Sequence, residues 1–116
     1  MIVIIAQFEF PAAAGEAVRQ VMRDMDAETA KEPGCIYYRH AVDVSEPNRV
    51  VLSEVWTDAA ALQAHFGSGH FAAFRAASRE LDIRAKVQQF EASGIDRSAP
   101  SYWKTLRDAS APKSQA

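Results

Sequence analysis

The sequence predicts an α+β fold, in which helices cover one face of a four-stranded antiparallel sheet. Three observations lead to this prediction. Runs with strand-like alternation and runs with an apolar residue every three or four positions follow one another in the order β-α-β-β-α-α-β. The apolar share of 48% in 116 residues is enough for one packed domain. A formal net charge of −2 is too small for a disordered chain of this apolar content.

The first strand is predicted over residues 2–10, where every even-numbered residue is apolar, and Pro11 ends it. A helix is predicted over residues 12–31, because apolar side chains recur there in steps of three and four. This helix ends at residues 32–34, Glu-Pro-Gly, since proline lacks the backbone N–H that a helix needs. The predicted inward stripe consists of Ala14, Val18, Val21, Met25 and Glu28.

The second and third strands are predicted over residues 35–43 and 49–57, because tyrosine and valine in these segments favour extended backbone. The segment between them includes residues 45–48, Ser-Glu-Pro-Asn, which are typical of a turn. A short polar connection of this kind joins the two strands as a hairpin.

Two short helices are predicted next, over residues 59–66 and 69–80, with glycines between them. Asp58 and Ser68 stand where a side chain can cap the first turn of each helix. A fourth strand follows over residues 83–92, where apolar residues alternate loosely.

This order of elements is the split βαββαβ, or ferredoxin-like, arrangement. Right-handed crossovers place the helices on one face of the sheet and leave the other face bare. The first three predicted strands carry apolar or aromatic residues toward both faces, so the bare face would be an exposed apolar patch. We therefore expect a homodimer in which two sheets pack face to face.

Composition and charge narrow the classes of function. Thirteen Lys and Arg residues against fifteen Asp and Glu residues do not form the positive surface of a nucleic-acid-binding protein. No apolar run approaches the roughly 20 residues of a membrane span, and the single cysteine cannot form an internal disulfide. We therefore expect a cytoplasmic protein without nucleic-acid or membrane partners.

The chain is predicted to divide into a domain over residues 1–93 and a C-terminal extension over residues 94–116, which is rich in Ser, Ala, Pro and Lys. Within the extension, Tyr102, Trp103 and Leu106 form a single apolar group. Burial of a large apolar side chain stabilises a protein by ~1.5–3 kcal/mol. We therefore expect the extension to dock on the domain or on the dimer partner.

The residues best suited to chemistry lie between positions 52 and 75. Glu54 and Trp56 are two residues apart on a strand and therefore share one face. His65 follows on the inward side of a short helix, and His70 begins the next helix. Together they would form an apolar pocket with few polar groups, which is typical of a small-molecule site.

A simpler interpretation exists for each of these residues. Trp56 would pack in the core, as large aromatic residues of strands usually do. Glu54 would form an ion pair with Arg39 or Arg75, because a buried charge without a partner is costly. The two histidines would serve as a hydrogen-bonded core residue and as a helix cap.

A metal site is a further interpretation, because His40, His65 and His70 could supply three imidazoles. The five-residue spacing between His65 and His70 is off one face of a continuous helix, and two glycines interrupt it. No glycine-rich phosphate loop, nucleophile elbow or dinucleotide fingerprint is present in the sequence. We therefore expect neither a metal nor an organic cofactor.

Three segments in this order, EPGCIYY, LSEVW and AHFGSGHF, resemble the antibiotic biosynthesis monooxygenase (ABM) family. The resemblance covers residues 1–93 and implies a dimeric α+β barrel. For several members it also implies oxygenation of quinols or polyketide anthrones by dioxygen, with no metal, flavin or haem. In this resemblance His65 or Glu54 would be the base. The implied substrate-binding residues are Trp56, Tyr38, His70, Phe74 and Gln7.

Two branches of that family differ from this sequence. Haem-degrading relatives carry Asn, Trp and His at the positions held here by Gln7, His65 and Arg75, which argues against haem degradation. A branch that processes a phosphorylated sugar derivative shares Glu54 and both histidines, but it carries Tyr at the position of Trp56.

The resulting prediction is a cofactor-independent monooxygenase that acts on a small quinol or related aromatic compound. Two alternatives stay open, because a shared fold is a weak guide to function. One is an isomerase or degradative enzyme for a small oxygenated metabolite. The other is a non-catalytic dimeric protein that binds a small ligand.

Overall fold

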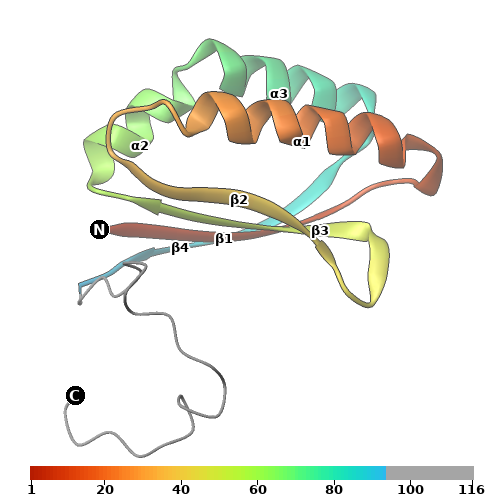
Figure 1. The fold of residues 1–116 in the computed structure, drawn as a ribbon, viewed down its shortest axis with the longest axis horizontal. Coiled ribbons are helices and arrows are strands. Elements are labelled where there is room, and N and C mark those ends of the chain that lie inside the picture. The colour runs from red at the N-terminus through yellow and green to blue at the C-terminus, as the bar shows by residue number, and fades with distance from the viewer. Residues whose placement is uncertain (94–116) are drawn as a thin grey trace, which may run out of the picture.

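The computed structural model describes residues 1–93 as one antiparallel sheet with all its helices on one face (Figure 1). The strand order is β2-β3-β1-β4, which confirms the predicted ferredoxin-like α+β fold. The strands and helices are β1 (Ile2–Glu9), the 3-10 turn η1 (Ala12–Ala14), α1 (Gly15–Thr29), β2 (Cys35–Asp43), β3 (Glu46–Trp56), α2 (Ala59–Phe66), α3 (Gly69–Glu80) and β4 (Arg84–Glu91).

The core lies between the helices and the inner face of the sheet. Strand alternation turns the even-numbered residues of β1 inward, and on β3 the register pairs Ile4 with Glu54 and Ile2 with Trp56. On the other side of β3, Glu54 pairs with Tyr38 of β2. Tyr38, Glu54 and Trp56 therefore lie on the inner face of the sheet. The buried apolar residues that surround them include Ile2, Ile4, Phe8, Val18, Met22, Met25, Leu52 and Leu62.

The buried stripe of α1 differs from the predicted one. It contains Gly15, Val18, Met22, Met25 and Thr29. The prediction of Val21 and Glu28 as inward residues is therefore wrong, because Val21 is only half-buried and Glu28 is exposed. Both stripes follow helical steps and share two members, so periodicity alone did not distinguish them. Glu28 instead forms an ion pair with Lys31 at 3.0 Å on the outer side.

The hairpin turn begins one residue earlier than predicted and is shorter. Val44 and Ser45 form it, and β3 already begins at Glu46, so the turn does not extend over residues 45–48. The Asp43 carboxylate closes the turn, because its Oδ1 accepts hydrogen bonds from the Ser45 backbone N–H at 2.8 Å and from the Ser45 hydroxyl at 2.7 Å. Such side-chain turns explain why aspartate favours these positions.

Both predicted helix caps are confirmed. The Asp58 carboxylate accepts a hydrogen bond from the Ala61 N–H at 2.9 Å, which fixes the start of α2. The Ser68 hydroxyl oxygen accepts one from the Phe71 N–H at 3.2 Å, which fixes the start of α3. The Ser68 cap lies at the break between the two helices that carry the candidate histidines.

No helix covers the outer face of the sheet within residues 1–93 (Figure 1). Ile5, Tyr37 and Phe90 lie on this face and are 40–50% exposed. The apolar outer face that motivated the homodimer prediction is thus present. Within the same residues, no helix is long and apolar enough to cross a membrane. The three apolar residues of the extension lie outside the described residues, so their docking stays a prediction.

Candidate functional site

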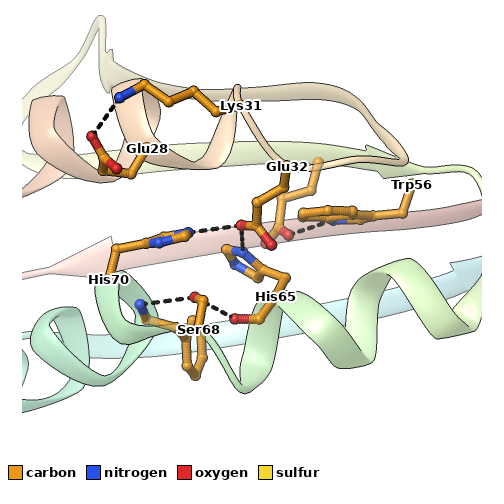
Figure 2. A network of polar contacts seen from close by, with 9 residues as sticks. Glu28, Lys31, Glu32, Trp56, His65, Ser68 and His70 are labelled. Atoms are coloured by element: carbon orange, nitrogen blue, oxygen red, sulfur yellow. Dashed lines mark hydrogen bonds and ion pairs between the residues drawn. The ribbon is translucent and has the colours of Figure 1, made fainter.

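Two imidazoles and one carboxylate meet at the end of the sheet where α2 and α3 join (Figure 2). Oε2 of Glu32 lies 2.6 Å from Nδ1 of His65 and 2.7 Å from Nε2 of His70. Since a carboxylate only accepts hydrogen bonds, both ring nitrogens donate to it. His65 is 1% exposed, and the other two side chains are partly exposed. The result is a His–Glu–His cluster with one shared oxygen.

Glu32 reaches this position because the loop after α1 packs closely on α2. Gly34 has a φ of 83°, and a Cβ atom there would lie 2.6 Å from Cβ of Ala61. Only glycine permits both this backbone conformation and this approach. The Glu32 backbone is also bonded on both sides, since its N–H donates to Thr29 and its carbonyl oxygen accepts from Cys35. The carboxylate is therefore held beside the end of α2.

Ser68 sets the relative placement of the two histidines. Its hydroxyl donates a hydrogen bond to the carbonyl oxygen of His65 at 2.7 Å while it caps α3 (Figure 2). His65 is in the last turn of α2, and His70 is in the first turn of α3. The spacing argument against a shared site applies only to one continuous helix; as predicted, the two residues belong to separate helices, and the break between the helices lets their side chains meet at Glu32.

His65 is placed to act as a neutral base. Burial lowers its pKa, although the hydrogen bond to Glu32 opposes that effect. With the Nδ1 proton directed at Glu32, the lone pair of the neutral ring is on Nε2, for which the structure gives no hydrogen-bond partner within residues 1–93. A carboxylate that fixes the tautomer of an imidazole in this way is a common arrangement for general-base catalysis.

Glu54 lies beside this cluster with a tryptophan as its partner. Its Oε1 accepts a hydrogen bond from Nε1 of Trp56 at 2.8 Å, and its side chain is 6% exposed. Burial raises the pKa of Glu54 to about 7, and the charge of Glu32 contributes in the same direction. The expected ion pair with Arg39 or Arg75 is not formed among the described residues. Arg39 lies on the outer face, opposite Ser53.

Aromatic rings enclose His65. The ring centroids of Trp56, Tyr38 and Phe71 lie 4.8, 5.4 and 5.2 Å from that of His65. Trp56 is fully buried, and burial raises the pKa of Tyr38 above its usual range. Trp56 is therefore a core residue, as the simpler interpretation predicted. The same indole also contacts the candidate site, because it donates a hydrogen bond to Glu54.

Gln7 and His40 lie away from the His–Glu–His cluster, whereas Phe74 is one turn beyond His70 on α3 and lines a cavity with it. Phe74 packs edge-to-face on Phe8, with ring centroids 5.8 Å apart. Gln7 points to the outer face of the sheet, where its amide lies 3.4 Å from Glu9, so the structure does not bring it to the other candidates. His40 pairs with Asp26 instead. Glu32, predicted only as a helix end, is the site residue that the sequence does not reveal, because no local pattern marks its contact with residues 33 and 38 positions away.

A cavity of about 270 Å³ lies between α1 and α3 next to the cluster. Its lining includes Met25, Glu28, His70 and Phe74. This volume is close to the lower end of the roughly 300–1,000 Å³ typical of small-molecule sites. His70 is the residue that connects this cavity to Glu32 and, through it, to His65.

Comparisons with family models and with solved structures both find antibiotic biosynthesis monooxygenases. A family model described as antibiotic biosynthesis monooxygenase matches residues 1–77. The crystal structure of an antibiotic biosynthesis monooxygenase is 28% identical, with a TM-score of 0.74 over 81% of this chain and 100% of that one. SnoaB, a cofactor-independent oxygenase from Streptomyces nogalater, is 21% identical, with a TM-score of 0.70 over 81% and 94% of the two chains. At this identity the second likeness is one of fold.

A curated relative is the uncharacterised protein sll1783 from Synechocystis, which is 42% identical over 60 residues. The match spans 52% of this chain and 40% of the relative, so it covers well under two thirds of that protein.

Proposed function

The chain belongs to the antibiotic biosynthesis monooxygenase family, and we propose that it is a cofactor-independent monooxygenase acting on a small quinol or related aromatic compound. The observation that carries this proposal is the pair of Glu32 and the buried His65, whose carboxylate–nitrogen distance is 2.6 Å. It presents a neutral imidazole nitrogen within a shell of aromatic rings. An aromatic substrate and a base that ionises it are the two requirements of such a reaction.

In the proposed reaction the substrate supplies all the electrons. Nε2 of His65 takes the phenolic proton, and the resulting electron-rich anion reduces dioxygen and forms a carbon–oxygen bond with it. One oxygen atom stays on the ring, and the other leaves as water. A quinol and O₂ thus give a hydroxyquinone and water, with four electrons passing from the substrate to oxygen.

The chain favours the substrate anion by electrostatics and by exclusion of water. Once protonated, the His65 imidazolium would be stabilised by Glu32 and would face the phenolate as a counter-charge. The buried Trp56 and Tyr38 keep the surroundings apolar, which strengthens this interaction. The cavity beside His70 and Phe74 is the proposed substrate entrance.

Glu54 is the second candidate for the base. With a pKa of about 7, it would be close to half-ionised at neutral pH. One of its oxygens already accepts a hydrogen bond from Trp56, and this bond also holds the indole against His65. We therefore assign proton abstraction to His65 and assign to Glu54 the positioning of Trp56.

Oxygen uptake tests the proposed reaction. Purified protein freed of metal and flavin is expected to consume dioxygen faster than the autoxidation blank with at least one member of a panel of reduced naphthoquinones. The expected stoichiometry is one O₂ per quinol, because the second oxygen atom leaves as water. Uptake equal to the blank across the panel would exclude this function. Substrate conversion without oxygen uptake would support the isomerase alternative.

The proposed assembly is a homodimer that covers the outer face of the sheet. Ile5, Tyr37 and Phe90 are the large apolar residues that the second copy would bury. Light scattering coupled to gel filtration should give about 26 kDa, twice the 12.8 kDa of one chain. Ile5→Arg should shift the mass toward one chain, because it introduces a charge into the interface. Ala27→Arg, on the exposed side of α1, is the matched control. A wild-type mass of one chain would contradict the dimer.

A further inference from the structure

We propose that Glu32, His65 and His70 form a binding site for a divalent transition-metal ion, with Zn²⁺ as the ion that fits best. Each residue offers one ligand atom, and these atoms all lie within 4.8 Å of one another, with both imidazole nitrogens directed at the same Glu32 oxygen (Figure 2). This inference goes beyond the proposed function, which requires no metal.

The chemistry of the ligand atoms selects the class of ion. Two imidazole nitrogens and one carboxylate oxygen suit Zn²⁺, Co²⁺ or Ni²⁺, and the same set of His, His and Glu holds zinc in known hydrolytic enzymes. Mg²⁺ and Ca²⁺ prefer oxygen ligands only, so they fit poorly here. Three protein ligands would leave a fourth position for water.

The site needs only small side-chain movements to accept an ion. Zinc–nitrogen and zinc–oxygen distances of about 2.0–2.2 Å place neighbouring tetrahedral ligand atoms roughly 3.3–3.5 Å apart. The carboxylate oxygen of Glu32 lies 2.6 and 2.7 Å from the two nitrogens, so it would withdraw by less than about 1 Å. The ligand atoms lie within 4.8 Å of one another, so the two imidazoles would also turn toward the ion. The ligand-bearing segments are already fixed by Ser68 and by the close contact at Gly34.

The local charge also favours a cation. Within residues 1–93, the Glu32 carboxylate has no lysine or arginine partner, and its hydrogen-bond partners are the two imidazoles. Lys31, the adjacent residue, is paired with Glu28 instead (Figure 2). A carboxylate without a cationic side chain beside it makes an attractive position for a divalent ion.

Metal binding and the proposed base reaction exclude each other. A metal on Nδ1 of His65 requires that nitrogen to lose its proton, so the neutral ring carries its proton on Nε2. Nε2 is then no longer a lone-pair base, and Zn²⁺ should inhibit oxygen uptake. The binding measurements below decide the metal site independently, because they do not depend on turnover.

Calorimetric titration of the full, tag-free chain with Zn²⁺ is the central experiment. We expect one ion per chain, with proton release, because bound imidazoles must be deprotonated. Co²⁺ should give the intense visible absorption of a four-coordinate ion, whereas Mg²⁺ should give no heat. Absence of Zn²⁺ binding at about 100 μM, where even a weak site of this affinity class would fill, would overturn the proposal.

Variants locate the site. Glu32→Gln and His70→Gln change partly exposed side chains and should each weaken Zn²⁺ binding by at least about tenfold, since even outer-shell changes cost about 10–100-fold. His40→Gln is the matched control, because His40 is also a buried imidazole paired with a carboxylate. Cys35→Ser removes the single thiol. Both controls should bind within about twofold of wild type. Loss of binding in either control, or unchanged binding in both ligand variants, would contradict the assignment.

Discussion

Replacement of His65 by glutamine is expected to lower kcat/KM for oxygen uptake by about 10²–10⁴-fold, the usual contribution of a general base. Glutamine has a similar volume and can still donate a hydrogen bond to Glu32, but its amide cannot take a proton. The loss should fall mainly on kcat, because the aromatic residues that bind the substrate stay in place. Steady-state oxygen-electrode kinetics with the best quinol of the panel measure this effect.

The chain provides a close control for this substitution. Nδ1 of His40 lies 2.7 Å from Asp26, so it forms an imidazole–carboxylate pair much like that of His65 and Glu32. Burial lowers the pKa of His40 as it does that of His65. His40→Gln should leave kcat/KM within about threefold of wild type, because this pair is outside the cluster. Equal losses in the two variants would indicate a general effect on folding and not a lost base.

Glu32 should act through His65 and not on the substrate directly. Glu32→Gln removes the charge that supports the imidazolium, so the pKa of His65 should fall and the acidic limb of the pH–rate profile should move to lower pH. A purely structural role of Glu32 would lower the amount of active protein without moving this limb.

Local signals carried most of the fold prediction. The caps at Asp58 and Ser68 could be predicted because each depends on a side chain and an N–H only three residues away. The face shared by Glu54 and Trp56 follows from the two-residue period of a strand. Periodicity does not fix the buried stripe of α1, because Val21 and Met22 are both apolar and only packing decides which one is buried.

The centre of the candidate site was beyond such reasoning. The partners of Glu32 are 33 and 38 positions away, and they meet only because the loop after α1 packs on α2. A carboxylate beside Pro33 and Gly34 is equally typical of an exposed turn. An ion pair with an arginine was also predicted for Glu54, whereas in the structure Glu54 is buried and accepts a hydrogen bond from Trp56. Contacts between distant segments, and not residue type, define this site.

Glu54→Gln is expected to stabilise the protein in alkaline solution and to leave its stability almost unchanged in acid. Burial raises the pKa of Glu54 from its ordinary 4.5 to about 7 in the folded protein. The folded state therefore holds a proton between these values that the unfolded state has lost, so stability falls as the pH rises from about 4.5 to about 7. At about 1.4 kcal/mol per pKa unit, the cost near pH 8 is up to about 3 kcal/mol.

Glutamine avoids this cost because it has no charge to bury, and its carbonyl oxygen can still accept the hydrogen bond from Trp56. Urea unfolding at one fixed protein concentration should therefore show a gain for Glu54→Gln near pH 8 that disappears near pH 4. Glu28→Gln, which changes an exposed carboxylate, should show no such pH-dependent gain. A gain of equal size at both pH values would mean that ionisation of Glu54 is not its cause. If this stabilised variant also keeps its kcat, Glu54 is not the base, and proton abstraction is left to His65.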